Sequence, residues 1–81
     1  MYLELITPDK KVFEGEVSSA ALPGTMGSFE VLNHHAPIIS SLANGTVRLK
    51  TADGNKTFQI EGGVVEVLAN KLVVLAEKVI D

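Results

Sequence analysis

The sequence contains no cysteine and no tryptophan, and it has only one tyrosine and one arginine. Without cysteine, neither a disulfide framework nor a cysteine-ligated metal site is available, which fits a reducing cytoplasm. With a single arginine and a net charge of −3 at pH 7, the chain lacks the basic surface that proteins use to bind nucleic acids and anionic membranes. We therefore expect no nucleic-acid partner.

Long hydrophobic runs are also missing. The longest one, Leu72 to Ala76, is far shorter than the roughly 20 residues of a membrane-spanning helix. The first residues have neither a basic region nor a long apolar region, so we expect no secretory signal. Any membrane association would have to come through a partner, without direct insertion of this chain.

Short alternating segments dominate what is present. Residues 2–7, 28–32 and 46–51 alternate between apolar and polar side chains, as strands with one buried face do. No window of helical length shows helical spacing, and turn signals recur at roughly 8 to 12 residue intervals. The pattern predicts one all-β domain over residues 1–81, a flattened β-sandwich or barrel of about seven to ten short, mostly antiparallel strands.

Glycine and proline positions predict where the strands turn. Pro23-Gly24 predicts a turn with proline and glycine at its centre, after a strand-like run in which Gly15 indicates a bulge or a close backbone approach. Asp53-Gly54 predicts a type I′ hairpin turn, because that turn needs positive φ at both central residues.

The C-terminal third has two further signals. Gly62-Gly63 predicts a break between two strands, and Ala69-Asn70 predicts the next turn. The run from Leu72 to Ala76 is apolar at every position, which is typical of a strand buried on both faces.

The two histidines, His34 and His35, are adjacent in a short segment that ends in Pro37. A closed zinc site needs about four protein ligands, and neighbours on extended backbone point to opposite faces, so a role other than metal binding is favoured. Ser40 and Ser41 lie close in sequence to His35, but no G-x-S-x-G elbow presents a serine nucleophile. A small hydrolase that uses the histidines remains an alternative to a contact surface.

Two other patterns suggest chemistry less strongly. Glu14 and Glu16 would face the same way at a Cα spacing of about 6.6 Å, which suits paired carboxylates, although a solvated strand face is the simpler interpretation. Lys71 follows a predicted turn, as does the lysine of small lipoyl or biotinyl carrier domains, but it lies near the end of the chain rather than at its middle. A carrier domain modified on Lys71 stays open as an alternative.

Three segments together, "FEGEV", "LPGTMGSFEVLNHHAPIISSLANGTVRL" and "IEGGVVEVLANKLVVLAE", resemble the N-terminal β-sandwich of the epsilon subunit of the bacterial F-type ATP synthase. The most specific parts are a Pro-Gly turn with a second glycine and then L-x-x-H-A-P from Leu32 to Pro37. The block Gly-Gly-x-x-Glu-Val from Gly62 to Val67 follows in the same order. The resemblance covers essentially the whole chain.

This resemblance implies a non-catalytic rotor subunit of the central stalk, which links the gamma subunit to the c-ring of a proton-translocating enzyme. It also implies a peripheral location on the cytoplasmic face of the bacterial inner membrane, with no cofactor and no small-molecule substrate. In the family, the loop with the H-A-P histidine and the loop around the second glycine lie together at the c-ring end. The implied c-ring contacts are Gly27, Ser28, His35, Ala36 and Pro37.

Gamma would bind apolar residues that stay exposed in the isolated domain, because interfaces of obligate assemblies are more apolar than ordinary surface. We expect these residues around Leu32, Ile38, Ile39 and Leu42.

The chain departs from the family pattern at three places. Asn33-His34 stands where relatives often have Pro-Gly, and Ser28 stands where an acidic residue often follows the second glycine. The family usually continues into a C-terminal helical hairpin that inhibits ATP hydrolysis and, in some members, binds ATP, whereas this sequence ends at Asp81. We expect this polypeptide neither to inhibit hydrolysis nor to bind ATP tightly.

Overall fold

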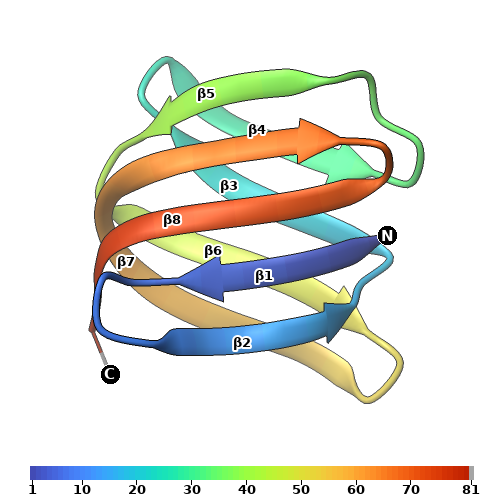
Figure 1. Cartoon of the computed structure of the whole chain (residues 1–81), viewed down its shortest axis with the longest axis horizontal. Helices are drawn as coiled ribbons and strands as arrows, with labels where there is room; N and C mark the ends of the chain where they lie inside the picture. Colours follow the sequence, from blue (N-terminus) through green and yellow to red (C-terminus); the bar gives the residue numbers. More distant parts are fainter. Residues whose placement is uncertain (81) are drawn as a thin grey trace.

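The computed structural model describes residues 1–80, which form eight strands and no helix (Figure 1). All strand pairs are antiparallel except that of the first and last strands, which run parallel. The prediction of an all-β sandwich of mostly antiparallel strands is confirmed. The strands are β1 (Tyr2–Ile6), β2 (Lys11–Glu16), β3 (Ser19–Gly24), β4 (Gly27–Leu32), β5 (Ile38–Leu42), β6 (Gly45–Thr51), β7 (Gly54–Leu68) and β8 (Lys71–Ile80).

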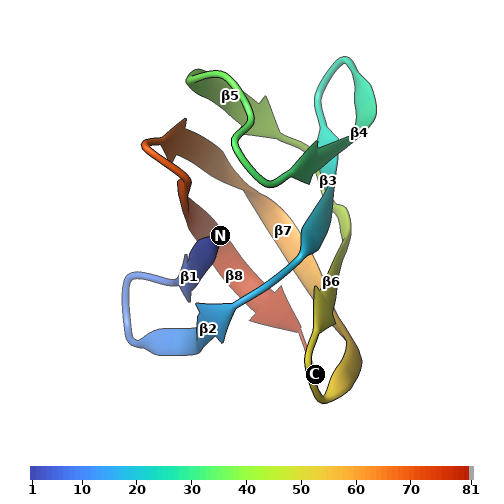
Figure 2. The ribbon, with the colours of Figure 1, turned by 90° about the vertical axis from the view of Figure 1, so that its right-hand side faces the viewer.

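The strands form two layers that face each other across the core (Figure 2). The first layer contains β2, β1, β8, the second half of β7, and β5; the second layer contains β4, β3, β6 and the first half of β7. β7 is 15 residues long and belongs to both layers: residues 54–60 pair with β6, and residues 63–67 pair with β5. One continuous strand therefore joins the two halves of the sandwich.

The predicted break at Gly62-Gly63 is wrong, because the strand bends there and continues. Glu61 pairs with Lys78 and Gly63 pairs with Ala76, so the register with β8 is the same on both sides of Gly62. Both glycines have positive φ, 62° and 136°. A Cβ on Gly63 would clash with the carbonyl oxygen of Leu75 and would lie 2.9 Å from Ala76 Cα, so only glycine fits this close approach.

The alternation of apolar and polar residues along the strands places the apolar side chains in the core, as the sequence predicts. Leu3 and Leu5 are fully buried while Glu4 between them is half-buried, and Val47 and Leu49 are buried on either side of exposed Arg48. The hydrophobic core comprises Met1, Leu3, Leu5, Val17, Ala20, Leu22, Val31, Leu42, Val47, Leu49, Ile60, Val65, Val67, Leu72, Val74 and Ala76.

Burial of β8 on both faces is not observed. Leu72, Val74 and Ala76 point into the core, whereas Leu75 is 51% exposed and Val73 is half-buried on the outer side. In a two-layer sandwich each sheet is covered on one side only, so the second apolar set of β8 has no third layer to pack against.

Two hairpin turns are displaced from their predicted positions. β3 extends through Pro23 to Gly24, which pairs with Gly27, and the turn residues are Thr25 and Met26. The positive φ of 123° belongs to Gly27 rather than to Gly24. The predicted Pro-Gly turn is wrong, because Pro23 remains in the strand. Gly24 and Gly27 pair with each other and close the hairpin.

The β6–β7 hairpin is present, but its turn residues are Ala52 and Asp53, and of the predicted pair only Gly54 has positive φ. The two central residues with positive φ that a type I′ turn requires are instead Ala69 and Asn70, between β7 and β8. Gly15 lies in regular pairing with Leu3, so a bulge there is also wrong; the register of β1 and β2 shifts elsewhere, after Leu5.

Gly63→Ala should lower the free energy of unfolding by about 3 kcal/mol or more, because the new Cβ would meet backbone atoms that cannot move aside. Gly54→Ala is the matched control, since Gly54 also has positive φ but has nothing within 4 Å of the added Cβ. Its cost should be about 1 kcal/mol. Urea unfolding of the three proteins gives both values, and equal costs would contradict a close approach at Gly63.

Candidate docking face

Apolar side chains that the core leaves uncovered gather on the outer side of β5, β7 and β8. Ile39 is 74% exposed, Leu68 58% and Leu75 51%. Val64 is also exposed, and it pairs with Leu75 on the neighbouring strand. We call this surface the docking face and define it by Ile39, Val64, Glu66, Leu68, Val73 and Leu75.

The docking face exists because β7 and β8 carry apolar residues at successive positions. The inner set supplies the core, through residues such as Val65 and Val67, and the outer set remains at the surface. Monomeric proteins rarely expose contiguous apolar surface of this kind unless it meets a partner. The geometry therefore indicates a protein-contact surface.

A shallow hollow of about 460 Å³ lies at one end of this surface, between β5 and β7. It brings Pro37, from the histidine segment, next to Leu68 and the carboxylate-bearing Glu66. The loop before β5 and the docking face are therefore one continuous surface. The hollow is lined by Pro37, Ile38, Ile39, Glu66, Val67 and Leu68.

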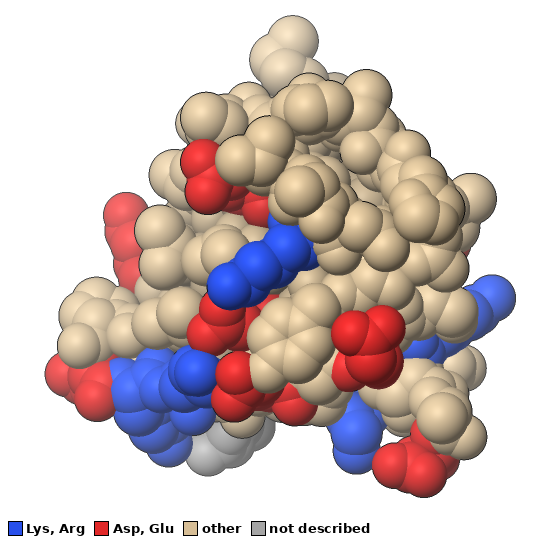
Figure 3. Space-filling model, turned by 45° about the vertical axis from the view of Figure 1, so that its right-hand side comes forward, with Lys and Arg blue, Asp and Glu red and all other residues tan. Residues whose placement is uncertain are grey.

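A network of charged side chains borders the docking face on β1, β2 and the start of β8. Lys11 Nζ lies 3.0 Å from Glu4 Oε2 and 3.3 Å from Glu14 Oε2, and Lys71 Nζ lies 3.0 Å from Glu4 Oε1. In Figure 3, charged residues gather over the lower half of the molecule and uncharged residues cover most of the upper half. The apolar surface thus has a polar border, as protein interfaces commonly do.

Hydrogen bonding within this network shifts the pKa values of its members. The bonds from Lys11 and then Lys71 lower the pKa of Glu4, and bonds from the Tyr2 hydroxyl and then Lys11 lower the pKa of Glu14. The same contacts raise the pKa of Lys11, through Glu4 first, and the pKa of Tyr2, through Glu14 first. The charged forms of Glu4, Glu14 and Lys11 and the neutral form of Tyr2 are therefore favoured at neutral pH.

Neither alternative chemistry gains support from this arrangement. Lys71 is the first residue of β8 rather than a turn residue, and it is ion-paired with Glu4. Glu14 and Glu16 engage different partners, since Glu16 Oε1 lies 3.5 Å from the α-amino group of Met1. They do not converge on one point as a catalytic carboxylate pair would.

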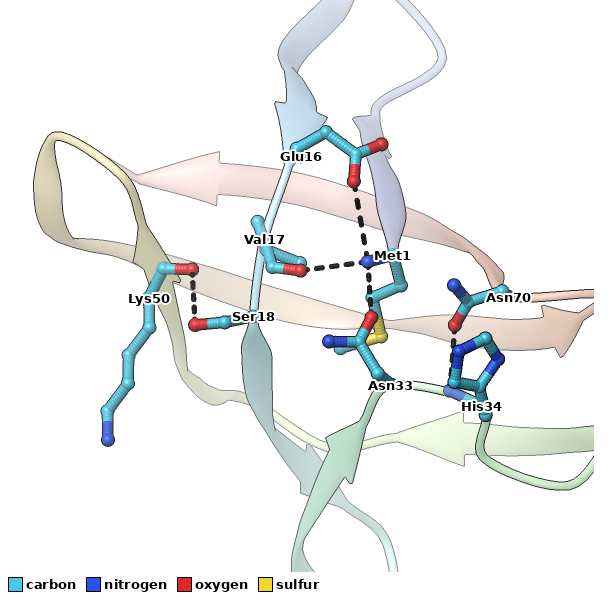
Figure 4. A network of polar contacts seen from close by, with 8 residues as sticks. All are labelled: Met1, Glu16, Val17, Ser18, Asn33, His34, Lys50 and Asn70. Carbon is cyan, nitrogen blue, oxygen red and sulfur yellow. Dashed lines mark hydrogen bonds and ion pairs between the residues drawn. The ribbon is translucent and has the colours of Figure 1, made fainter.

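A second polar network fixes the histidine segment at the end of the sandwich (Figure 4). The α-amino group of Met1 donates to the carbonyl oxygen of Val17 at 3.1 Å and to Asn33 Oδ1 at 2.6 Å. The backbone N–H of His34 donates to Asn70 Oδ1 at 2.8 Å, and the Tyr2 N–H donates to the Asn70 carbonyl at 3.2 Å. The loop is therefore tied to both β1 and the β7–β8 turn.

The backbone at His34 has a conformation that favours glycine. His34 has φ of 62° and Asn70 has φ of 61°, a conformation that glycine adopts freely and other residues adopt at a cost. The family resemblance implies glycine at the His34 position, which such a φ would suit. The bond between the His34 N–H and the Asn70 side chain offsets part of this cost, and glycine at position 70 would have no side chain to make it.

The two histidines lie in and just after a turn between β4 and β5. The segment turns at Asn33 and His34, so the expectation of extended backbone there is wrong. His35 Nδ1 lies 2.7 Å from the carbonyl oxygen of Ala36, and the backbone N–H of His35 donates to Leu32 O at 3.3 Å. Residues 1–80 contain no group of three or more His, Cys, Asp or Glu side chains that could hold a metal ion.

The five predicted c-ring residues do not lie together. Gly27 and Ser28 begin β4, beside the turn to β3, whereas His35, Ala36 and Pro37 follow the other end of β4 (Figure 1). The six residues of β4 separate the two loops by about 17 Å. The expectation that both loops share one end of the sandwich is wrong.

The residues expected to contact gamma also separate into groups. Ile39 belongs to the docking face, and Leu32 is 54% exposed at the end of β4. Ile38 is half-buried and packs against the core, and Leu42 is only 4% exposed, so Leu42 is not available for contact. Reasoning from the sequence missed Leu68, Leu75 and Glu66, although the unbroken apolar run on β8 was a usable signal.

Among residues 1–80, no helix has the length and apolar character needed to cross a membrane.

Comparison with known proteins identifies the type of domain. A model of the family described as "ATP synthase, Delta/Epsilon chain, beta-sandwich domain" matches residues 1–81. The ATP synthase epsilon chain of Chlorobaculum tepidum is 46% identical over 78 residues, covering 95% of this chain and 89% of the relative. That of Caulobacter vibrioides is 36% identical over 81 residues, covering 100% and 94%. The Pelotomaculum thermopropionicum chain is 46% identical, but only 55% of its length is matched.

Two solved structures share the fold. A chain in the central stalk and c-ring structure of the Tetrahymena thermophila mitochondrial ATP synthase aligns with a TM-score of 0.81 and 22% identity. A chain in the Euglena gracilis mitochondrial ATP synthase structure aligns with a TM-score of 0.88 and 21% identity. The alignments cover 99% and 96% of this chain, which spans 65% and 51% of those two chains.

Asn70→Gly and Ala69→Gly should have different effects, although both replace a residue of positive φ in the same turn. Ala69→Gly should raise the free energy of unfolding by about 1 kcal/mol, because it removes backbone strain. Asn70→Gly should not raise it, because the substitution also removes the acceptor for the His34 N–H. Amide exchange at His34 should accelerate in Asn70→Gly alone, and equal exchange in both variants would contradict a stabilising bond between His34 and Asn70.

Acid should weaken the domain partly through Glu4, whose pKa lies below its ordinary value of 4.5. A lowered folded-state pKa stabilises the protein fully above the unfolded value, and this contribution is lost as the pH falls through the folded one. Urea unfolding midpoints between about pH 5 and about pH 3 should therefore fall less steeply for Glu4→Gln and for Lys11→Met than for the unsubstituted chain. An unchanged slope in both variants would contradict the network.

Proposed function

This chain belongs to the family of ATP synthase delta and epsilon chains, and we therefore propose that it is a non-catalytic rotor subunit of the central stalk. In this proposal it links the gamma subunit to the c-ring of a proton-translocating enzyme, at the cytoplasmic face of a bacterial inner membrane. The family match over the whole sequence supports it, as does the fold shared with chains of two ATP synthase assemblies.

The docking face is the observation that carries the gamma contact. Its side chains lie on three adjacent strands and are apolar except for Glu66, and Ile39, Leu68 and Leu75 are each more than half exposed. Such a surface on a hydrogen-bonded sheet suits a permanent interface, because it is rigid before the partner arrives. We assign His35, Ala36 and Pro37 to the same contact, since the hollow joins Pro37 to Leu68.

The c-ring contact belongs, in this proposal, to the other end of β4. Gly27 and Ser28 lie there beside Met26, which is 99% exposed at the β3–β4 turn. A subunit that bridges two partners needs two separate surfaces, and the separation along β4 supplies them. Ser28 in place of an acidic residue would make this contact less dependent on charge than in other family members.

A rotor subunit must also resist deformation between these surfaces. β7 pairs with β6, β5 and β8, so the two layers are joined by a continuous strand as well as by core packing. Dense apolar packing across the layers has low compressibility and transmits strain. These properties support a mechanical role.

Ile39→Asp and Leu68→Asp should each weaken binding of the cognate gamma subunit by about tenfold or more, because each places a charge in the apolar contact. Thr57→Asp is the matched control, since it adds the same charge at an exposed position of the second layer. Titration calorimetry with purified gamma measures the affinities of the three variants and of the unsubstituted chain. Equal affinities would exclude the docking face as the gamma contact, and no binding by the unsubstituted chain would contradict the stalk assignment.

A further inference from the structure

One charged residue lies in the middle of the docking face. Glu66 is exposed on β7, and its strand pairings place Ile39 on β5 and Val73 on β8 directly beside it. Along β7, Val64 and Leu68 occupy the same side, about 6.6 Å before and after it. Each of the four nearest positions on the outer surface is therefore apolar.

No cation within residues 1–80 forms an ion pair with Glu66. The nearest basic residue on this side by register is Lys71, which pairs with Leu68 across β7 and β8. Lys71 Nζ already lies 3.0 Å from a carboxylate oxygen of Glu4. Glu4 is on β1, which flanks β8 on one edge, whereas Glu66 is on β7, which flanks it on the other. The carboxylate of Glu66 thus depends on water in the isolated domain.

Docking would remove that water. An unpaired carboxylate in the centre of an apolar interface is strongly destabilising, whereas one that meets a hydrogen-bonded cation loses much less. We propose that the docking face selects a partner segment that places a lysine or arginine side chain on the Glu66 carboxylate. This inference rests on the proposed function, in which that partner is the gamma subunit, and it adds the chemistry by which the partner is recognised.

The hollow beside Glu66 specifies a second part of the partner. It is lined by Pro37, Ile39 and Leu68 among others, so it fits an apolar side chain. The partner segment therefore presents an apolar side chain for the hollow next to the basic side chain for Glu66. This combination distinguishes it from a purely apolar surface.

A second copy of this chain fits poorly on the same face. A symmetric dimer would use the same patch on both subunits and would bring two Glu66 carboxylates toward each other without a cation. The net charge of −3 would add further repulsion between the copies. The observations therefore favour a basic, non-identical partner.

The test compares gamma binding by the unsubstituted chain, Glu66→Gln and Glu66→Lys. Binding should fall about thirtyfold or more for Glu66→Gln and further for Glu66→Lys, because the partner cation is left unpaired or repelled. The affinity of Glu66→Gln should also depend less on salt. Glu30→Gln is the control, since Glu30 is an exposed acid on β4 in the other layer, and it should bind like the unsubstituted chain.

Folding and binding effects are separated by urea unfolding. Glu66→Gln should not lower the unfolding midpoint, because Glu66 has no ion pair within residues 1–80. Equal gamma affinities for Glu66→Gln and Glu30→Gln would overturn this inference while leaving the proposed function intact. No binding by the unsubstituted chain would overturn both, and a dimer of the isolated chain that forms through this face would overturn the choice of partner.

Discussion

The continuity of β7 through its double-glycine bend is the constraint on which the rest of the structure depends. A strand that ended at Gly62 would remove the most extensive backbone link between the two layers, leaving core packing and shorter pairings such as that of Gly24 with Leu42. Because the strand continues, its first half completes the β6 layer and its second half forms the centre of the docking face. The bend requires the close approach of Gly63 to the Leu75 carbonyl oxygen. The pairing of β7 with both layers, and the outer surface between β5 and β8, therefore depend on this contact.

The docking face follows from the composition of β7 and β8. A strand at the surface of a two-layer sandwich needs only one apolar side chain in two, yet these strands carry more. The surplus does not stabilise the isolated domain, since it faces water. Its position beside a polar border of ion pairs gives it the organisation of an interface, with a central apolar area and a charged periphery.

Periodicity in the sequence was sufficient for the fold class and for most of the core, because each inward-facing residue on β1, β4 and β6 reflects a local alternation. Turn positions were less predictable. Whether Gly54 is a central turn residue or the first residue of the next strand depends on how β6 and β7 register, which is a property of the whole sheet. The bend at Gly62 likewise depends on pairing with residues far away in sequence.

The candidate site was predictable only in part, for a similar reason. Ile39 was identified among residues near the histidine segment, but Leu42 is turned inward by its pairing with Gly63. Glu66 belongs to the Gly-Gly-x-x-Glu-Val block, but its apolar surroundings could not be recognised from the sequence, because its neighbours come from β5 and β8 as well as β7. The positive φ of His34 was signalled only by the family resemblance, which implies glycine at that position.

The parallel pairing of β1 with β8 has a consequence for how the subunit is made. β8 lies between β1 and β7, so the first layer cannot assemble until this ten-residue strand has been synthesised. Contacts between strands so far apart in sequence are slow to form, since a large loop must close before they stabilise anything. The docking face consequently lacks Val73 and Leu75 until β8 has been synthesised, so it is incomplete on any shorter nascent chain.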